Sequence, residues 1–121
     1  MAAGSMKLIE NRGDHLFVEY DGLIGPAELM GLMEEVARVC SDKNCKKILA
    51  DLRNAEGPLN ILDRFNLGVV AADMFRGVNQ IAIVFRKDET NLFAETVAVN
   101  RGLPSKITHD MDEATRWLGL E

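Results

Sequence analysis

Short apolar runs alternate with amphipathic stretches along this chain, and that alternation limits its fold more than any other feature. Residues 6–10, 15–20, 46–52, 81–85 and 106–108 form runs of strand length. Apolar residues recur at three- and four-residue steps from Pro26 to near 41–44, at about 61–76, at about 90–100 and after Asp110. Strands that alternate with helices of this length indicate βαβ units and a mostly parallel sheet, connected by right-handed crossovers.

The first two runs are the exception to this alternation. Only the turn cluster Asn11-Arg12-Gly13-Asp14 separates them, which favours an antiparallel hairpin. The sequence therefore predicts an α/β fold of order ββαβαβαβα, with the first strand antiparallel at one edge of the sheet. The segment 53–58 is expected to be a loop.

Residues that favour helix ends support the predicted helices. Pro26 suits a first helical position, and Glu28 falls in the first turn, where the helix dipole favours an acid. Asn60 and Asp110 are expected to cap the second and fourth helices, with Glu113 three residues after the latter.

Length and charge narrow the class of protein. The chain has 121 residues and a formal net charge of −5, which argues against a general nucleic-acid binder and against electrostatic docking on anionic lipid. Residues 1–5 resemble a vector-derived remnant, and residues 6–121 are expected to form a single domain. No run predicts an integral membrane segment, and no secretory signal is recognised, so a cytoplasmic protein is expected.

The two cysteines, Cys40 and Cys45, lie near the end of the first predicted helix. A zinc site would need two more ligands at suitable spacing, and His15 and His109 lie far from this pair in the sequence. We therefore expect two thiols, Cys40 partly buried and Cys45 near a turn, and no metal.

Ligands in open α/β sheets gather outside the carboxyl ends of parallel strands. In this chain that rule selects a group of candidate ligand-binding residues: Asp51, Arg53, Asn54, Arg86, Asp88, His109 and Asp110. Together they could bind an anion or transfer a proton. Each also has a structural explanation, as a solvated strand end, a loop hydrogen bond or a helix cap.

Catalytic and cofactor motifs are not recognised in the sequence. There is no G-x-S-x-G nucleophile elbow, no phosphate-binding G-x-x-x-x-G-K-[ST] or G-x-G-x-x-G loop, and no H-E-x-x-H. We therefore assign no catalytic residue and no cofactor, and a small enzyme using Asp51 or His109 remains an alternative.

The predicted helix 61–76 is apolar on two sides. One stripe, assigned to the core, contains Ile61, Phe65, Val69, Ala72 and Phe75. The second stripe, a candidate partner interface, contains Leu67, Val70, Ala71 and Met74. A helix that covers one sheet needs one such face, so a neighbouring helix, a second subunit, an apolar ligand or a membrane surface must cover the other.

Several motifs, taken in order, resemble the bacterial SpoIIAA-like group, also described as STAS/SEC14-domain proteins. They are Asp51-Leu52-Arg53, Gly57-Pro58-Leu59, Asp63-Arg64-Phe65, Phe93-Ala94-Glu95-Thr96-Val97-Ala98, Asn100-Arg101-Gly102 and Asp112-Glu113-Ala114-x-x-Trp117-Leu118. The resemblance implies a (βα) superhelix with a five-stranded mixed sheet in sequential order, helices mainly on one side, and a small cytoplasmic domain that is often dimeric.

The resemblance also bears on function. The group's anti-sigma-factor antagonists present a phosphorylatable serine at the start of the helix after the third strand. Here that region reads Leu59-Asn60-Ile61-Leu62-Asp63, which has no serine or threonine, so the phospho-switch is not carried over. We expect a non-enzymatic, homodimeric binding domain that engages a protein partner or small apolar ligand through helix 61–76 and the preceding loop. A lipid carrier is the other alternative.

Overall fold

The sheet and helices follow the predicted order with one addition. The computed structural model describes residues 6–57, 61–86 and 93–120. Its elements are β1 (Met6–Asn11), β2 (Leu16–Leu23), α1 (Pro26–Lys43), β3 (Lys47–Asp51), β4 (Ala55–Glu56), α2 (Ile61–Met74), β5 (Gln80–Val84), α3 (Phe93–Asn100), β6 (Ser105–Thr108) and α4 (Met111–Leu118). Residues 1–5, the proposed cap Asn60 and the candidate Asp88 lie outside the described residues.

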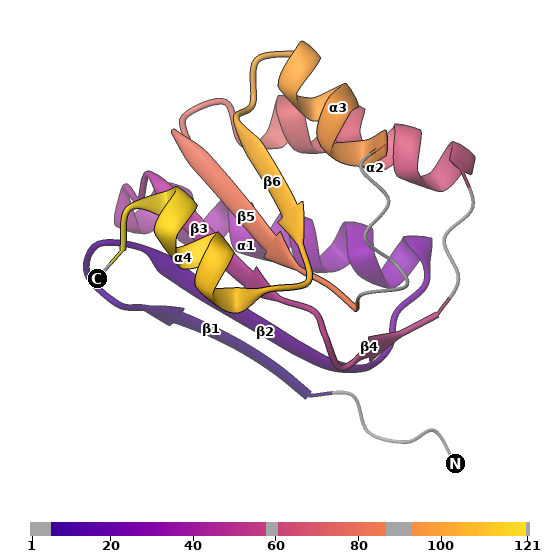
Figure 1. The fold of residues 1–121 in the computed structure, drawn as a ribbon, viewed down its shortest axis with the longest axis horizontal. Helices are drawn as coiled ribbons and strands as arrows, with labels where there is room; N and C mark the ends of the chain where they lie inside the picture. The colour runs from indigo at the N-terminus through magenta and orange to yellow at the C-terminus, as the bar shows by residue number, and fades with distance from the viewer. Residues whose placement is uncertain (1–5, 58–60, 87–92, 121) are drawn as a thin grey trace.

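The main path of the sheet runs β1-β2-β3-β5-β6 (Figure 1). β1 pairs antiparallel with β2 at one edge, and the remaining neighbours on this path are parallel. This confirms the predicted mixed sheet, its sequential order and its antiparallel first strand.

β4 corrects the expectation that 53–58 is entirely a loop. Gly22 pairs with Ala55 and Leu23 with Glu56, parallel to β2. β2 continues to Leu23, whereas its pairing with β3 ends where Glu19 faces Asp51. The last part of β2 therefore has a free edge, and β4 supplies its hydrogen-bond partners.

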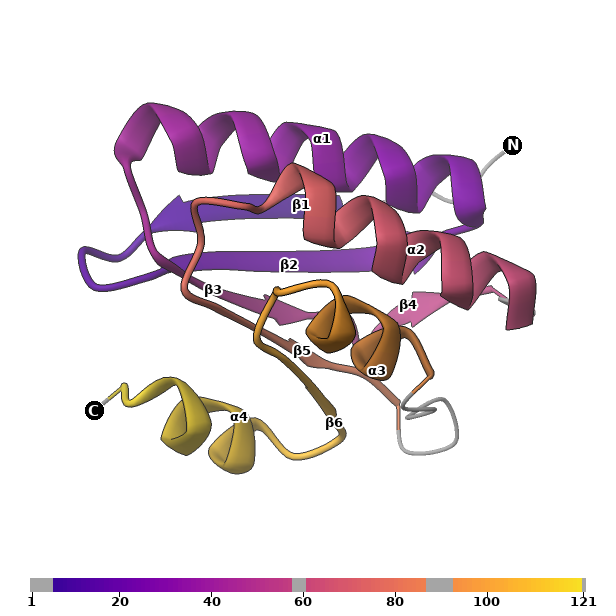
Figure 2. The same cartoon turned by 90° about the horizontal axis from the view of Figure 1, so that it is seen from above.

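The helices form unequal layers on the two faces of the sheet. α1, α2 and α3 lie on one face, and α4 lies alone on the other (Figure 2). Alternate side chains of β2 divide between these faces: Leu16 and Val18 join the larger core, while Phe17 packs with Ala114 and Leu118 of α4. The carboxyl edge of the sheet thus has α2 on one side and α4 on the other.

Two predicted helix starts are confirmed. Pro26 opens α1, and the Glu28 carboxylate accepts from Gly25 N–H at 2.8 Å. Asp110 caps α4, because its Oδ1 accepts from the backbone N–H of Asp112 at 2.9 Å and of Glu113 at 3.4 Å.

The cysteines differ from the expectation of two thiols. Cys40 and Cys45 are joined in a disulfide with their Cα atoms 5.1 Å apart. The helix cap explains the pairing. Asn44 adopts a left-handed conformation, and the N–H of Cys45 donates to the carbonyl of Cys40 at 3.0 Å, which turns the chain back on the last turn of α1.

Candidate functional site

The strand register sets the geometry of the carboxyl edge. Asp51 of β3 lies opposite Val84 of β5, which lies opposite Thr108 of β6. The residues after these strands therefore share one edge, as the topology predicts. Asp51 and Thr108 are two strand spacings apart, about 10 Å, with Val84 between them.

Asp51 is buried, and Arg53 binds both of its carboxylate oxygens. Arg53 Nε lies 3.0 Å from Asp51 Oδ1, and Nη2 lies 2.9 Å from Oδ2. Arg53 N–H adds a third bond to Oδ1 at 3.1 Å. Burial alone raises the pKa of Asp51, but the hydrogen bonds and charge of Arg53 outweigh it, so the pKa is lowered from its usual value.

The other residues after these strands support β4. The backbone carbonyl of Asn54 accepts from Gly22 N–H at 3.1 Å, and Arg86 Nη1 donates to the carbonyl of Ala55 at 2.6 Å. The Asn54 backbone and the Arg86 side chain thus help to hold β4 in place, while Arg53 binds Asp51, which gives each of them a structural role beside any contact with a ligand.

His109 stands apart from the Asp51 pair. It is exposed at the start of the turn into α4. The neighbouring Thr108 hydroxyl donates to the Glu113 carboxylate, and Lys106 Nζ lies 3.1 Å from the same carboxyl group. These contacts lower the pKa of Glu113, the Thr108 hydrogen bond most. Arg53 binds both carboxylate oxygens of Asp51, and Thr108, the neighbour of His109, lies two strands away from Asp51. The described contacts therefore do not join Asp51 and His109 as an acid–base pair.

α2 packs residues of both apolar stripes against the core, whereas the sequence interpretation assigned only one stripe to it. Ala72 and Phe75 are buried as expected, but Phe65, assigned to the core, is 38% exposed. Leu67, Ala71 and Met74 of the candidate interface are half-buried against the larger core. The sequence indicated two apolar sides, but the helical projection alone did not show that both sides contribute to the core. The side chain of Ile61 lies outside the described residues.

Val70, the fourth candidate interface residue, lines a surface groove of about 480 Å³ between α2 and the residues after α3. Charged side chains share this groove: Asp73, Arg76 and Arg101. A carrier for lipid requires an enclosed, mostly apolar pocket, so this charged groove adds no support to that alternative.

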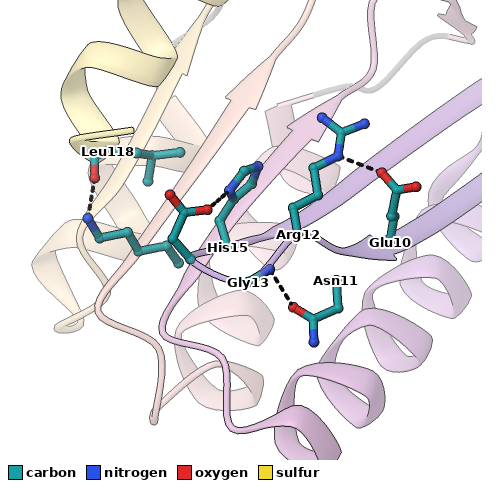
Figure 3. A network of polar contacts seen from close by, with 8 residues as sticks. Glu10, Asn11, Arg12, Gly13, His15 and Leu118 are labelled. Carbon is teal, nitrogen blue, oxygen red and sulfur yellow. Dashed lines mark hydrogen bonds and ion pairs between the residues drawn. The ribbon is translucent and has the colours of Figure 1, made fainter. Parts of the chain in front are cut away.

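A second polar network lies at the opposite, amino edge of the sheet (Figure 3). Buried His15 bonds through Nδ1 to Asp14 Oδ1 at 2.7 Å, which lowers the pKa of Asp14. Lys47 Nζ donates to the carbonyl of Leu118 at the end of α4, and the Arg12 guanidinium lies 3.9 Å from the centre of the Phe17 ring. Sequence reasoning missed this network, because its members come from separate turns and strand starts.

Neither a metal-binding cluster nor a membrane-spanning helix is present among the residues that the structure describes. No group of three or more His, Cys, Asp or Glu side chains within residues 6–57, 61–86 and 93–120 is placed to hold a metal ion. Over the same ranges, no helix combines the length and the apolar character needed to cross a bilayer.

Comparison with known proteins identifies the fold. No protein-family model and no curated protein matches the sequence. Among solved structures, the chain is similar to an anti-sigma factor antagonist from Mycobacterium paratuberculosis, with a TM-score of 0.65, 17% identity, and coverage of 98% of this chain and 99% of that one. It is also similar to an uncharacterised protein with a SpoIIAA-like fold from Shewanella loihica, with a TM-score of 0.52, 17% identity and 98% coverage of both chains. The chain has the SpoIIAA-like fold.

Proposed function

We propose that this chain is a non-enzymatic, cytoplasmic regulatory domain that binds a protein partner through α2 and the loop before it. The fold it shares with an anti-sigma factor antagonist supports a protein-binding role. The structural roles of Asp51, Arg53 and Arg86 at the carboxyl edge support binding rather than catalysis. The net charge of −5 favours a protein over a nucleic acid as the partner.

One observation carries the choice of surface. Leu62 is 63% exposed and Phe65 is 38% exposed, and both lie in the first turns of α2. Residues three apart on a helix share a face, so these side chains form one apolar spot at the start of α2. Large apolar side chains that gather at one surface position are typical of docking sites, whereas single ones are ordinary.

Of the sequence-derived interface residues, Val70 lies on the groove side of α2. Leu67, Ala71 and Met74 lie on the opposite side of the helix from the proposed spot, half-buried against the larger core, so the spot does not include them. A second copy of the chain docking on the same face would make a homodimer, which is one form of the proposed interaction.

Site-specific photo-crosslinking in the native host tests the proposal. A photoreactive phenylalanine analogue replaces Phe65 in one variant and Val99 in another. Val99 is a suitable control because it is also an exposed apolar side chain, 47% exposed, but lies on α3 rather than on α2. We expect a discrete crosslinked protein from position 65 that position 99 does not give.

The mass of the crosslinked product identifies the partner class. A product of twice the chain mass indicates a homodimer, and any other discrete mass indicates a different protein. Adding Leu62→Asp to the crosslinker at position 65 should abolish the product. No discrete product at position 65, or the same product from both positions, would contradict docking through α2.

A further inference from the structure

The disulfide lies where the backbone already holds its two cysteines together. Asn44, in the left-handed conformation, donates from its N–H to the carbonyl of Ser41 at 3.2 Å, and Cys45 donates to that of Cys40 at 3.0 Å. These bonds form the Schellman-type end of α1. The two Cα atoms are therefore close whether or not the sulfur atoms are bonded.

At this position the disulfide contributes little to the stability of the fold. A disulfide stabilises a fold mainly by restricting the unfolded chain, and the effect is smallest for short loops. Cys40 and Cys45 are only five residues apart. Because the fold meets the distance requirement without the bond, the dithiol form fits the same backbone.

A surface groove gives access to the disulfide. It has a volume of about 210 Å³, and both cysteines line it together with Ser41, Asn44 and Lys46. Cys40 is 3% exposed, whereas Cys45 is half-buried, so Cys45 is the more exposed residue of the pair. The far wall is formed by the last residue of α2 and the turn after it, with Met74, Phe75, Gly77 and Val78.

The charge near the groove favours an anionic thiol. The exposed Lys46 ammonium sits at the groove and donates to the carbonyl of Gly77 at 3.1 Å. Lys46 is the charged side chain among the described residues that line the groove. A small peptide thiol that carries carboxylates, such as glutathione, complements this positive charge.

We propose that Cys40 and Cys45 form a reversible dithiol–disulfide couple that exchanges with glutathione in this groove. The thiolate of one glutathione attacks Cys45 Sγ, the Cys40–Cys45 bond breaks, and Cys40 Sγ leaves as a thiolate and takes up a proton. A second glutathione thiolate attacks the glutathione sulfur of the mixed disulfide, which releases glutathione disulfide and the Cys45 thiolate, which is then protonated. Two glutathione molecules are oxidised as the protein disulfide gains two electrons and two protons, and the reverse reaction restores the bond.

A redox titration of the intact protein tests the couple. The protein is equilibrated in glutathione buffers of stepped reduced-to-oxidised ratio, quenched with acid, labelled with N-ethylmaleimide and weighed by intact mass spectrometry. We expect the number of maleimide labels per chain to rise from zero to two as the buffer becomes more reducing, and to fall back to zero when the ratio is reversed. The far-ultraviolet circular dichroism spectrum should stay unchanged.

Two results would overturn the proposal. If the folded protein takes no label at the most reducing ratio, and two labels appear only when denaturant is added to the same glutathione buffer, the bond does not exchange in the folded protein. If it takes two labels at every ratio, the cysteines are ordinary thiols.

Single variants test the assigned sulfur and the groove. In Cys40→Ser the remaining Cys45 should form a mixed disulfide with glutathione disulfide several-fold faster than the remaining Cys40 does in Cys45→Ser. Lys46→Glu should slow the reaction of glutathione with the wild-type disulfide several-fold, but not that of the neutral thiol β-mercaptoethanol. Equal rates for the two cysteines, or equal slowing of both thiols, would contradict exchange through this groove.

Discussion

Arg53 binds both carboxylate oxygens of Asp51 from a position only two residues along the chain, with contacts of 3.0 and 2.9 Å. The bond from Arg53 N–H to the same carboxylate fixes the turn that leads from β3 to β4. Asp51 is 7% exposed, so its charge depends on these partners rather than on water. The pair therefore stabilises the edge of the sheet that precedes α2.

Removing the Asp51 charge should destabilise the fold measurably. We expect Asp51→Asn to lower the free energy of unfolding by about 1.5–3 kcal/mol, the usual range for a lost hydrogen-bonded charge. Urea denaturation measures this change. Asp73→Asn is the matched control, because Asp73 pairs with Arg76 on the surface with both side chains at least 70% exposed. That variant should change stability by no more than about 0.5 kcal/mol, and an equal effect of the two variants would contradict the role of the Asp51 pair.

The same pair predicts a dependence on pH. Because the folded pKa of Asp51 is lowered, its contribution is fully present above the unfolded pKa, near 4, and is lost as the pH falls through the folded value. The difference in unfolding free energy between wild type and Asp51→Asn should therefore be constant near pH 7 and shrink below about pH 4. Urea titrations at stepped pH measure it, and a difference that persists unchanged into acid would contradict this linkage.

Gly57 occupies a position that excludes a side chain. Its φ is +140°, and an added Cβ would lie 2.4 Å from the backbone carbonyl oxygen of Ile24. We expect Gly57→Ala to cost about 2–3 kcal/mol of stability, since both the backbone and its neighbour must shift. Gly31→Ala is the control, because Gly31 lies within α1 with open space around it, and it should stabilise by about 0.5–1 kcal/mol. Thermal unfolding compares the two, and changes of the same sign would contradict the account of Gly57.

The cap of α4 gives a smaller effect. Asp110→Ala removes the acceptor for two backbone N–H groups and should lower stability by about 1 kcal/mol. Asp42→Ala provides the comparison, because Asp42 is exposed in the last turn of α1 and caps nothing. Its effect should stay within about 0.5 kcal/mol of zero by chemical denaturation. A loss in Asp42→Ala as large as in Asp110→Ala would show that the cap is not the cause.

Local patterns explain why the sequence predicts most of this fold. Helix periodicity, Pro26 and the Asp110 cap are each contained in a few adjacent residues, so the order of elements follows from the sequence. β4 could not be predicted in this way. β4 has only two residues, and it forms because β2 extends beyond the end of its pairing with β3 and leaves a free edge.

The site depends more on tertiary context. The position of Asp51 at the end of β3 was predictable, but its occupation by Arg53 depends on burial and on the turn into β4. The disulfide had a local signal, since a left-handed Asn44 returns the chain to the last turn of α1, yet spacing alone does not reveal that turn. In α2 the orientation follows from packing against α1, α3 and the sheet, which the helical projection does not contain.

The orientation of α2 leads to the last prediction. Leu67 is half-buried against the larger core, whereas Leu62 is 63% exposed. Leu67→Asp should therefore lower stability by about 2 kcal/mol or more, because a carboxylate would enter an apolar contact. Leu62→Asp should stay within about 0.5 kcal/mol of wild type. Urea denaturation of the two variants decides the orientation: a stable Leu67→Asp together with a destabilised Leu62→Asp would mean that α2 is turned the other way, and the proposed docking spot would then belong to the core.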